Sequence, residues 1–337
     1  MVIVVQMDEK RKPSQLEALW KEKDMASGKT VDAMVIIMRT SGCAWAKTCG
    51  CTMCGYGQAS MKGVTPDDLM RQLDQALKKY DNEPFVKIYT SGSFLDDKEV
   101  PPEIRERIFD SFKGAERILF ESRPEFITED VLKTVPKNVT IALGLESSNP
   151  EILEISVRKG FTPDDSRRAG MMIKKAGLKV RTYLLLKPLY LNEKDAIDDA
   201  ISSVMFADRF SDEISVNPVN VQKFTLIERI WKKGDYRPPW IWSLIHVMKE
   251  CAGSINARLM SSPSGGGTQR GVHNCGTCDK DALDAVERFS FSQNIKDIET
   301  VSCDCKKKWN DVMAAEILLG TSSDIMRTID NDLAIGK

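Results

Sequence analysis

Three cysteines near the start of the chain have the type and spacing that can hold an iron–sulfur cluster. Cys43, Cys51 and Cys54 follow a C-x7-C-x2-C pattern, and their thiolates can ligate three irons of a cubic [4Fe–4S] cluster. One iron would then stay open to bind a small molecule. Cys49 is an alternative to Cys43, but a C-x-C pair with Cys51 would crowd two ligands of one cube. A zinc knuckle made from these four cysteines is the other alternative.

The three cysteines follow a predicted strand at residues 34–40. Further strands are predicted at residues 85–90, 117–122, 139–146, 180–187 and 213–217, with helical segments between them. Thr-Pro-Asp-Asp begins two of these helices, at residues 65 and 162. No Gly-x-Gly-x-x-Gly follows the first strand, which argues against a dinucleotide-binding fold. The pattern favours a barrel, where loops after the strands carry the chemistry.

Polar residues stand at the end of each predicted strand. Because strand ends converge at one face of a barrel, these residues indicate an active site. The alternative for each is a helix cap or an ion pair. The candidates at the ends of the second to fifth strands are Gly92, Ser93, Glu121, Arg123, Glu146 and Lys187. Asn217, Asn220 and Gln222 are expected to face the same mouth.

Several short motifs in a fixed order carry a family resemblance. They include Gly-Cys-Thr-Met-Cys-Gly-Tyr from residue 50, Gly-Ser-Phe-Leu-Asp from residue 92, Glu-Ser-Arg-Pro-Glu from residue 121 and Gly-Leu-Glu-Ser-Ser-Asn from residue 144. Together they resemble the elongator-type branch of the radical S-adenosylmethionine (SAM) superfamily. Within that branch the chain is similar to the radical SAM subunits of archaeal archaeosine synthases, over residues 39–309.

The resemblance implies a partial (β/α)6 TIM-like radical SAM barrel and a radical SAM lyase of tRNA modification. In such enzymes the [4Fe–4S] cluster holds SAM, whose reductive cleavage gives a 5′-deoxyadenosyl radical. The implied substrate is a lysine adduct of 7-cyano-7-deazaguanine in the tRNA D-loop, whose C–N bond is cleaved to give archaeosine. The implied partner is a lysine-transferring, transglycosylase-like archaeosine synthase subunit.

The resemblance also assigns roles to the residues at the strand ends. Gly92 would let the backbone approach SAM closely, and Arg123 could fork onto the methionyl carboxylate. Glu121 and Glu146 could accept from the amino group or the ribose hydroxyls. Another elongator-type enzyme, acting on a different RNA base or a small molecule, is the alternative within the same branch.

A second cysteine group lies near the end of the chain. Cys275 and Cys278 form a C-x2-C pair, and Cys303 and Cys305 a C-x-C pair. Four thiolates predict a structural zinc site, with His273 as a replacement ligand and a second [4Fe–4S] cluster as the rival assignment. The preceding Gly265-Gly266-Gly267 and Arg270 fit either a flexible linker or a phosphate contact.

Composition sets outer limits on the protein's class. The 337 residues are 42% hydrophobic with a net charge of −1, which describes a soluble globular protein and neither supports nor excludes an RNA substrate. Eight of the nine cysteines fall in the two groups, which indicates metal binding in a reducing cytoplasm. The sequence shows no apolar run long enough for a membrane span and no secretory signal.

We expect three regions. Residues 1–33 form an N-terminal extension with one short helix at about residues 13–23, residues 34–255 form the barrel, and residues 256–337 form the cysteine-rich metal-binding region with a helical tail. A protein of a different class, a zinc-containing RNA-binding scaffold with two structural metal sites, would share this pattern but would be colourless.

Overall fold

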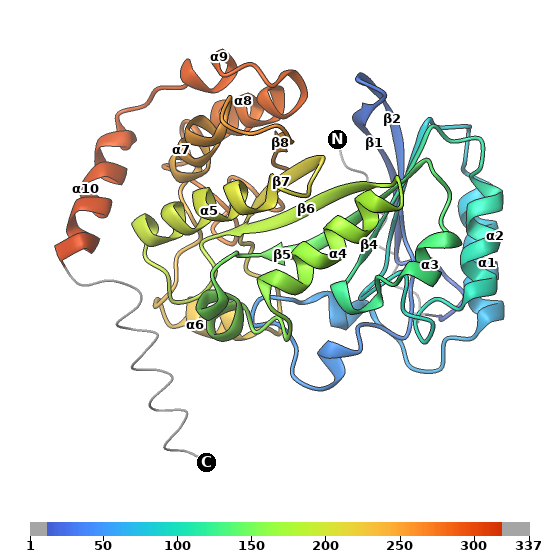
Figure 1. The fold of residues 1–337 in the computed structure, drawn as a ribbon. Coiled ribbons are helices and arrows are strands. Elements are labelled where there is room, and N and C mark those ends of the chain that lie inside the picture. Colours follow the sequence, from blue (N-terminus) through green and yellow to red (C-terminus); the bar gives the residue numbers. More distant parts are fainter. Residues whose placement is uncertain (1–11, 319–337) are drawn as a thin grey trace. The chain divides into compact units, whose positions relative to one another are not determined.

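Within residues 12–318, the strands form one eight-stranded sheet, and their order in the sheet is their order in the chain (Figure 1). The computed structural model describes residues 12–318. The strands are β1 (Ala18–Ala26), β2 (Lys29–Ile37), β3 (Phe85–Tyr89), β4 (Arg117–Ser122), β5 (Val139–Glu146), β6 (Lys179–Leu186), β7 (Glu213–Pro218) and β8 (Arg258–Met260). β1 pairs antiparallel with β2, whereas the pairs β2–β3, β3–β4, β4–β5 and β7–β8 are parallel.

Helices separate the parallel strands, so that six strand–helix units follow one another from β2 onward. Parallel strands wound in chain order with helices between them are the topology of a β/α barrel. The predicted partial (β/α)6 TIM-like barrel is therefore confirmed. The helices are α1 (Pro66–Leu77), α2 (Pro102–Ser111), α3 (Glu129–Lys133), α4 (Pro163–Lys175), α5 (Glu193–Ala207), α6 (Leu226–Lys232), α7 (Ile241–Cys251), α8 (Asp279–Ser292), α9 (Lys296–Glu299) and α10 (Cys305–Leu318).

The predicted helix at about residues 13–23 is wrong. Residues 18–26 are strand β1, which pairs with β2 along nine residues. Ser27 and Gly28, both at positive φ, make the two-residue turn that suits a hairpin. Backbone pairing across this hairpin overrides the local helical pattern. β2 consequently begins at Lys29 and not at residue 34, so part of the predicted extension belongs to the sheet.

The helix starts read from Thr-Pro-Asp-Asp are confirmed where their caps are described. Thr65 caps α1 in a capping box: its hydroxyl accepts from the Asp68 amide, and the Asp68 carboxylate accepts from the Thr65 amide. β8 was not predicted, because three residues carry too little pattern to mark a strand. The predicted division into extension, barrel and C-terminal region stays a prediction, and its residues 1–11 and 319–337 lie outside the described part.

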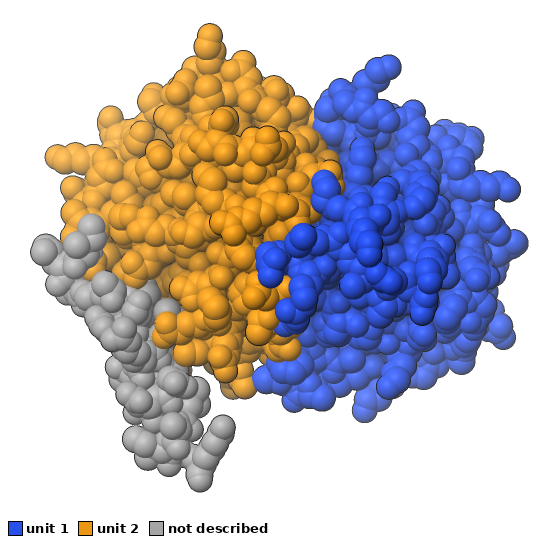
Figure 2. All heavy atoms as spheres, in the orientation of Figure 1, with its two compact units in different colours: residues 1–49, 56–144, 165–181 blue, residues 50–55, 145–164, 182–337 orange. Residues whose placement is uncertain are grey.

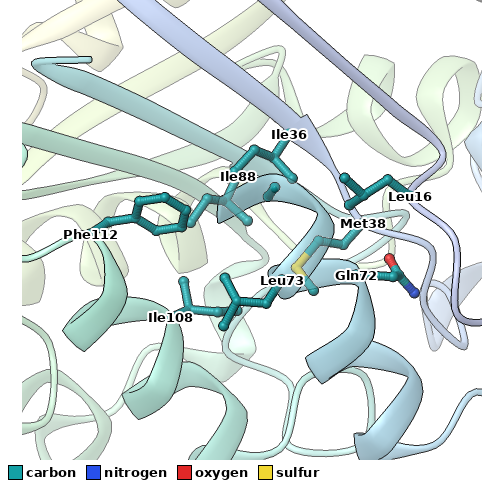
Figure 3. A pocket seen from close by; sticks show the side chains of 9 residues that line it. Leu16, Ile36, Met38, Gln72, Leu73, Ile88, Ile108 and Phe112 are labelled. Atoms are coloured by element: carbon teal, nitrogen blue, oxygen red, sulfur yellow. The ribbon is translucent and has the colours of Figure 1, made fainter. Parts of the chain in front are cut away.

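The described chain falls into two compact units, coloured separately in Figure 2. Among the described residues, unit 1 comprises residues 12–49, 56–144 and 165–181. Its core lies between β2 and β3 and the helices α1 and α2. Figure 3 shows a small pocket there, lined by side chains that are almost all apolar, including Ile36, Met38, Leu73, Ile88 and Phe112. This pocket is part of the core and not a candidate active site.

Among the described residues, unit 2 comprises residues 50–55, 145–164 and 182–318. Helices α5 and α7 contact each other, and α10 contacts α5. Trp240 and Trp242 are 6% and 2% exposed, so these two aromatic side chains are core residues. Within residues 12–318, the longest and most apolar helices still fall short of what a bilayer span requires.

Candidate active site and metal centre

The chain leaves β2 through a tightly fixed segment that leads to Cys43. The buried Gln72 side chain accepts from the Arg39 amide and donates to the Arg39 carbonyl, each at 2.8 Å. The Thr40 hydroxyl donates to Glu99 Oε1 at 2.5 Å and accepts from the Gly42 amide at 3.2 Å. These bonds leave little freedom in the backbone just before Cys43.

Gly92, at the end of β3, lies against the backbone of Cys43. A Cβ added to Gly92 would lie 2.6 Å from Cys43 Cα and 2.3 Å from Glu99 Oε2. Such distances are far shorter than van der Waals contact, so only glycine fits here. Glu99 is 3% exposed, and its Oε2 accepts from the Ser93 amide at 2.6 Å. Burial raises the pKa of Glu99, against the hydrogen bond from Thr40.

Arg123 and Glu121 stand at the end of β4. The Arg123 amide donates to Ser93 Oγ at 3.0 Å, and its guanidinium donates through Nε to Glu125 at 2.5 Å. The same guanidinium lies 5.6 Å from the ring of Trp45, in the cysteine segment. The Glu121 carbonyl accepts from Phe94 N at 2.9 Å. Unit 1 thus brings Cys43, Gly92, Ser93 and Arg123 into one connected cluster.

Cys51 and Cys54 lie in a turn that belongs to unit 2. Thr52 fixes this turn: its amide donates to Val157 O at 3.1 Å, and its hydroxyl donates to Ser156 O at 2.6 Å. Both acceptors lie in the π-helical segment Ile152–Val157, which follows β5. The Gly55 amide donates to Gln222 Oε1 at 2.5 Å. The turn is therefore held on both sides by other parts of its own unit.

Glu146 and Lys187, the candidates at the ends of β5 and β6, are both ion-paired. Glu146 Oε1 lies 2.6 Å from Lys159 Nζ, and Lys187 Nζ lies 2.6 Å from Glu193 Oε2. Lys187 is 7% exposed, so its charge is balanced inside unit 2 by a buried carboxylate. Both residues have positive φ, 71° and 62°, a conformation that non-glycine residues adopt mainly where function or packing demands it.

The C-terminal cysteines form a compact group of four sulfur atoms. The sulfurs of Cys275, Cys278, Cys303 and Cys305 all lie within 4.8 Å of one another, with separations of 3.6–3.8 Å for three of the pairs. Four thiolates about 2.3 Å from a tetrahedral zinc ion would be about 3.8 Å apart. A [4Fe–4S] cube places four irons between its thiolates and holds them further apart, so the spacing fits a single ion.

Neighbouring donors prepare this group for a metal. Trp242 Nε1 donates to Cys305 Sγ at 3.2 Å, and Asn274 Nδ2 donates to Cys278 Sγ at 3.4 Å. Such bonds orient thiolate ligands. The Cys278 amide lowers the pKa of Cys275 to about 6, which favours the thiolate, whereas burial raises the pKa of Cys278 and of Cys305. His273 is not one of the group: its Nδ1 lies 2.7 Å from the Gly271 carbonyl.

The glycine-rich segment before these cysteines is folded, which argues against the flexible linker, one of the two alternatives for it. The Gly267 amide donates to Val272 O at 2.8 Å, and a Cβ on Gly271 would lie 2.2 Å from Gly265 O. Arg270 donates to Glu228 Oε1 at 2.5 Å and to Val221 O at 2.9 Å. Close backbone packing explains the glycines, and Arg270 is engaged inside the protein.

Comparison with known proteins identifies the family. A sequence model of the Radical SAM superfamily matches residues 37–200. The chain is 40% identical over 332 residues to archaeosine synthase subunit beta of Methanosarcina acetivorans, covering 94% of this chain and 95% of that protein. It is 37% identical over 314 residues to the protein of the same name from Thermococcus kodakarensis, covering 89% and 97%. The chain belongs to the archaeosine synthase subunit beta family of radical SAM enzymes.

A solved structure of another radical SAM protein agrees with the fold of this chain. A radical SAM methyltransferase from Sphaerobacter thermophilus superposes with a TM-score of 0.50 at 14% identity, covering 74% of this chain and 78% of that one. Identity this low supports the fold alone. The segment that matches the superfamily contains all three cysteines of the C-x7-C-x2-C motif and all six strand-end candidates.

Membership of the archaeosine synthase subunit beta family, within the radical SAM superfamily, implies a [4Fe–4S] cluster and SAM. Cys43, Cys51 and Cys54 are the cysteines whose spacing suits this cofactor. None of Cys43, Cys51 and Cys54 is in a disulfide, and each is at least partly accessible. Thiols outside disulfides are the form that ligates iron.

Two buried carboxylates near the candidate residues, Glu99 and Asp199, were not predicted from the sequence. Glu99 lies in an Asp-Asp-Lys-Glu run that has the composition of a solvent-exposed loop. Asp199, in α5, is 8% exposed and accepts from Ser147 Oγ at 2.7 Å. Only the helical spacing of α5 could have signalled that Asp199 lies on a buried face.

Proposed function

We propose that the chain is the radical SAM subunit of an archaeosine synthase and acts on tRNA. The observation that carries the proposal is the 40% identity to an archaeosine synthase subunit beta over 95% of that protein's length. The proposed reaction cleaves the C–N bond of a lysine adduct of 7-cyano-7-deazaguanine in the D-loop and leaves archaeosine. Hydrogen abstraction from the lysine part starts the cleavage.

In this proposal Cys43, Cys51 and Cys54 hold the cluster, with Cys49 as the alternative to Cys43. When bound, the cluster and SAM supply a radical that abstracts hydrogen from unreactive carbon. The chain's own task is to hold two ligand segments still. Gly92 supports the Cys43 backbone by close approach, and Thr52 anchors the Cys51–Cys54 turn through two hydrogen bonds.

SAM would be bound by the strand-end residues Gly92, Ser93, Glu121, Arg123, Glu146 and Lys187. These residues differ in the hydrogen bonds and ion pairs that each would have to exchange to bind SAM. The Ser93 hydroxyl accepts from the Arg123 amide, so it acts by positioning that residue. Glu146 and Lys187 already hold ion-pair partners, and binding a ligand through either charge requires exchange of that partner. Arg123 pairs with the more exposed Glu125, which a ligand carboxylate replaces at little cost.

The C-terminal group is proposed to hold one structural zinc ion. The spacing of the four sulfurs supports one tetrahedral ion over a second cluster. With four protein ligands the ion has no open position, so its role is to fix the surrounding chain and not to activate a substrate.

The proposed partner is a lysine-transferring, transglycosylase-like archaeosine synthase subunit, because the adduct must be made before it can be cleaved. Two relatives are named archaeosine synthase subunit beta, and this name supports a complex with another subunit. The proposed location is the cytoplasm, where reduced thiols and tRNA are both present.

One anaerobic reaction tests the function. Reconstituted protein, SAM and a reductant are mixed with archaeal tRNA carrying the lysine adduct, and nucleosides are analysed by mass spectrometry. Archaeosine together with released 5′-deoxyadenosine is the expected result, and Cys51→Ala should abolish both. Cleavage of SAM without archaeosine would move the substrate to another RNA base or a small molecule. A colourless protein that never cleaves SAM would favour the zinc-containing RNA-binding scaffold.

A further inference from the structure

Phe224 is the most exposed of the large apolar side chains described, at 76%. It lies in the loop that follows β7 and precedes α6. Its backbone is left-handed, with φ at 65°, an uncommon conformation for a bulky residue. A phenylalanine placed in water on a constrained backbone calls for an explanation that core packing does not provide.

The local sequence explains why this side chain points outward. Thr225 is the N-cap of α6, and its hydroxyl accepts from the Glu228 amide at 3.2 Å. An apolar residue just before an N-cap usually packs on the fourth residue of the helix. That position is Arg229, which is exposed. Phe224 therefore has no apolar partner on its own helix.

The loop is firmly held, so the exposure of Phe224 is built in. The Phe224 amide donates to Glu228 Oε2 at 2.8 Å. Glu228 in turn accepts from Arg270, whose Nε donates to Val221 O and whose carbonyl accepts from the Val221 amide at 2.7 Å. Both ends of the short segment are thus fastened to Arg270 in the same unit.

The same segment packs on the turn that carries Cys51 and Cys54, entirely within unit 2. Gln222, two residues before Phe224, accepts from the Gly55 amide at 2.5 Å. The Ile227 amide donates to Thr52 O at 3.2 Å. Met53 packs against the buried cluster that contains Val221 and Ile227. The segment that carries Phe224 is consequently bonded to the turn that carries two of the proposed cluster ligands.

Exposed charges around Phe224 are mostly positive. Between residues 219 and 235 the exposed charged side chains are Lys223, Arg229, Lys232, Lys233 and Asp235. The remaining charged side chain in this range, Glu228, is buried and paired with Arg270 and with the exposed Lys232. Four exposed cations against one exposed anion suit a polyanion such as the phosphate backbone of RNA, and not a basic or apolar surface.

We propose that Phe224 is a stacking platform for a base of the RNA substrate, and that the basic side chains of residues 223–233 contact its phosphates. An aromatic face beside cationic side chains is how proteins hold unpaired nucleotides. The inference rests on the proposed function and adds to it a surface that receives an RNA base next to the cysteine turn.

The test compares RNA affinity among exposed-site variants of the reconstituted full-length protein. Fluorescence anisotropy measures the Kd for tRNA carrying the lysine adduct, and SAM cleavage and metal content are measured on the same samples. Phe224→Ala should weaken RNA binding roughly 5- to 150-fold, the range found for loss of one stacked base. Phe224→Trp should restore affinity, because any aromatic face can stack. Met171→Ala, which removes another exposed apolar side chain (54% exposed), should change the Kd less than twofold.

The other outcomes distinguish a failure of the stacking role of Phe224 from a failure of the proposed archaeosine synthase function. If the wild-type protein makes archaeosine and Phe224→Ala binds the RNA within twofold of it, the stacking role is wrong and the function stands. If Phe224→Ala instead weakens association with the partner subunit at unchanged RNA affinity, the surface binds protein and the inference is overturned. If the wild type neither binds nor modifies the RNA, both fail together.

Discussion

At the scale of single residues, close backbone approach decides what can stand at the end of β3. Gly92→Ala would place a methyl group 2.6 Å from Cys43 Cα and 2.3 Å from Glu99 Oε2. The Cys43 segment must then move, because neither a backbone atom nor a buried carboxylate can yield without breaking its own contacts. We expect lower iron content after reconstitution and at least about tenfold slower 5′-deoxyadenosine release, since small misplacements near the chemistry cost rate steeply.

Gly114→Ala is the matched control for this prediction. A Cβ at Gly114, also in unit 1, meets nothing within 4 Å, so iron content and SAM cleavage should stay at the wild-type level. Equal iron content and equal rates for Gly92→Ala would show that the Cys43 segment is not held by this approach.

A second residue-scale prediction concerns Asp199 and pH. Burial raises its pKa to about 7, against the hydrogen bond from Ser147. Between the ordinary Asp value and about 7, the folded protein keeps a proton that the unfolded chain has lost. Stability therefore falls as pH rises through this window. At about 1.4 kcal/mol per unit the loss is at most about 4 kcal/mol.

Asp199→Asn removes this titration and keeps an acceptor for Ser147. Denaturant unfolding at pH 4.5 and pH 8, both chosen to bracket the window, should show the wild type losing stability relative to the variant. Parallel pH profiles for the two proteins would mean that Asp199 titrates normally in the fold.

The residue types at the site were predictable, but their partners were not. Strand order placed Arg123 and Glu146 correctly at the ends of β4 and β5, and Cys43 correctly in the loop after β2. The partner of Glu146 is Lys159, beyond the π-helical segment, and nothing in the sequence marks that segment as π-helical. The choice of ion-pair partner depends on the local backbone conformation. That conformation is determined by tertiary packing and leaves no pattern in the sequence.

At the scale of elements, α10 depends on the proposed metal. Cys305 is its first residue, Trp309 donates to Ser243 Oγ at 2.8 Å, and Glu316 accepts from the Glu193 amide at 2.7 Å. A metal that fixes the start of α10 thus supports its contacts with α5 and α7. Cys305→Ser or chelation should remove about one equivalent of zinc and lower the unfolding temperature.

Hydrogen exchange identifies the element that responds. Amides of α10 should exchange faster in Cys305→Ser, whereas those of α1, in unit 1, should not change. Lys307→Ser, an exposed change on the same helix, serves as the control. Retained zinc, or iron and sulfide in its place, would contradict the single-ion assignment.

Most elements were predictable because their signals are local. Strands β4 and β5 have the predicted bounds, since each is a short apolar run closed by turn residues. β1 was missed because its stability comes from pairing with β2 and from the Ser27-Gly28 turn. A strand made by its neighbour leaves a weak pattern in its own sequence.

At the scale of the whole molecule, net charge and local charge make opposite predictions about RNA. The net charge of −1 gives no general attraction for a polyanion, so affinity should come from the basic group around α6. Two double variants have equal total charge: Lys232→Glu/Lys233→Glu on or next to α6, and Lys174→Glu/Lys175→Glu at the end of α4. Each takes the net charge from −1 to −5, because every change removes one positive charge and adds one negative charge.

The salt dependence of tRNA binding distinguishes the two effects. Loss of two phosphate contacts should reduce the slope of log K against log salt concentration by roughly 1.4–1.8. We expect this reduction for Lys232→Glu/Lys233→Glu and an unchanged slope for Lys174→Glu/Lys175→Glu. Since the two proteins carry the same total charge, a difference in slope can arise only from where the charge lies. Equal slopes would mean that the protein's overall field, and not the surface beside Phe224, governs RNA binding.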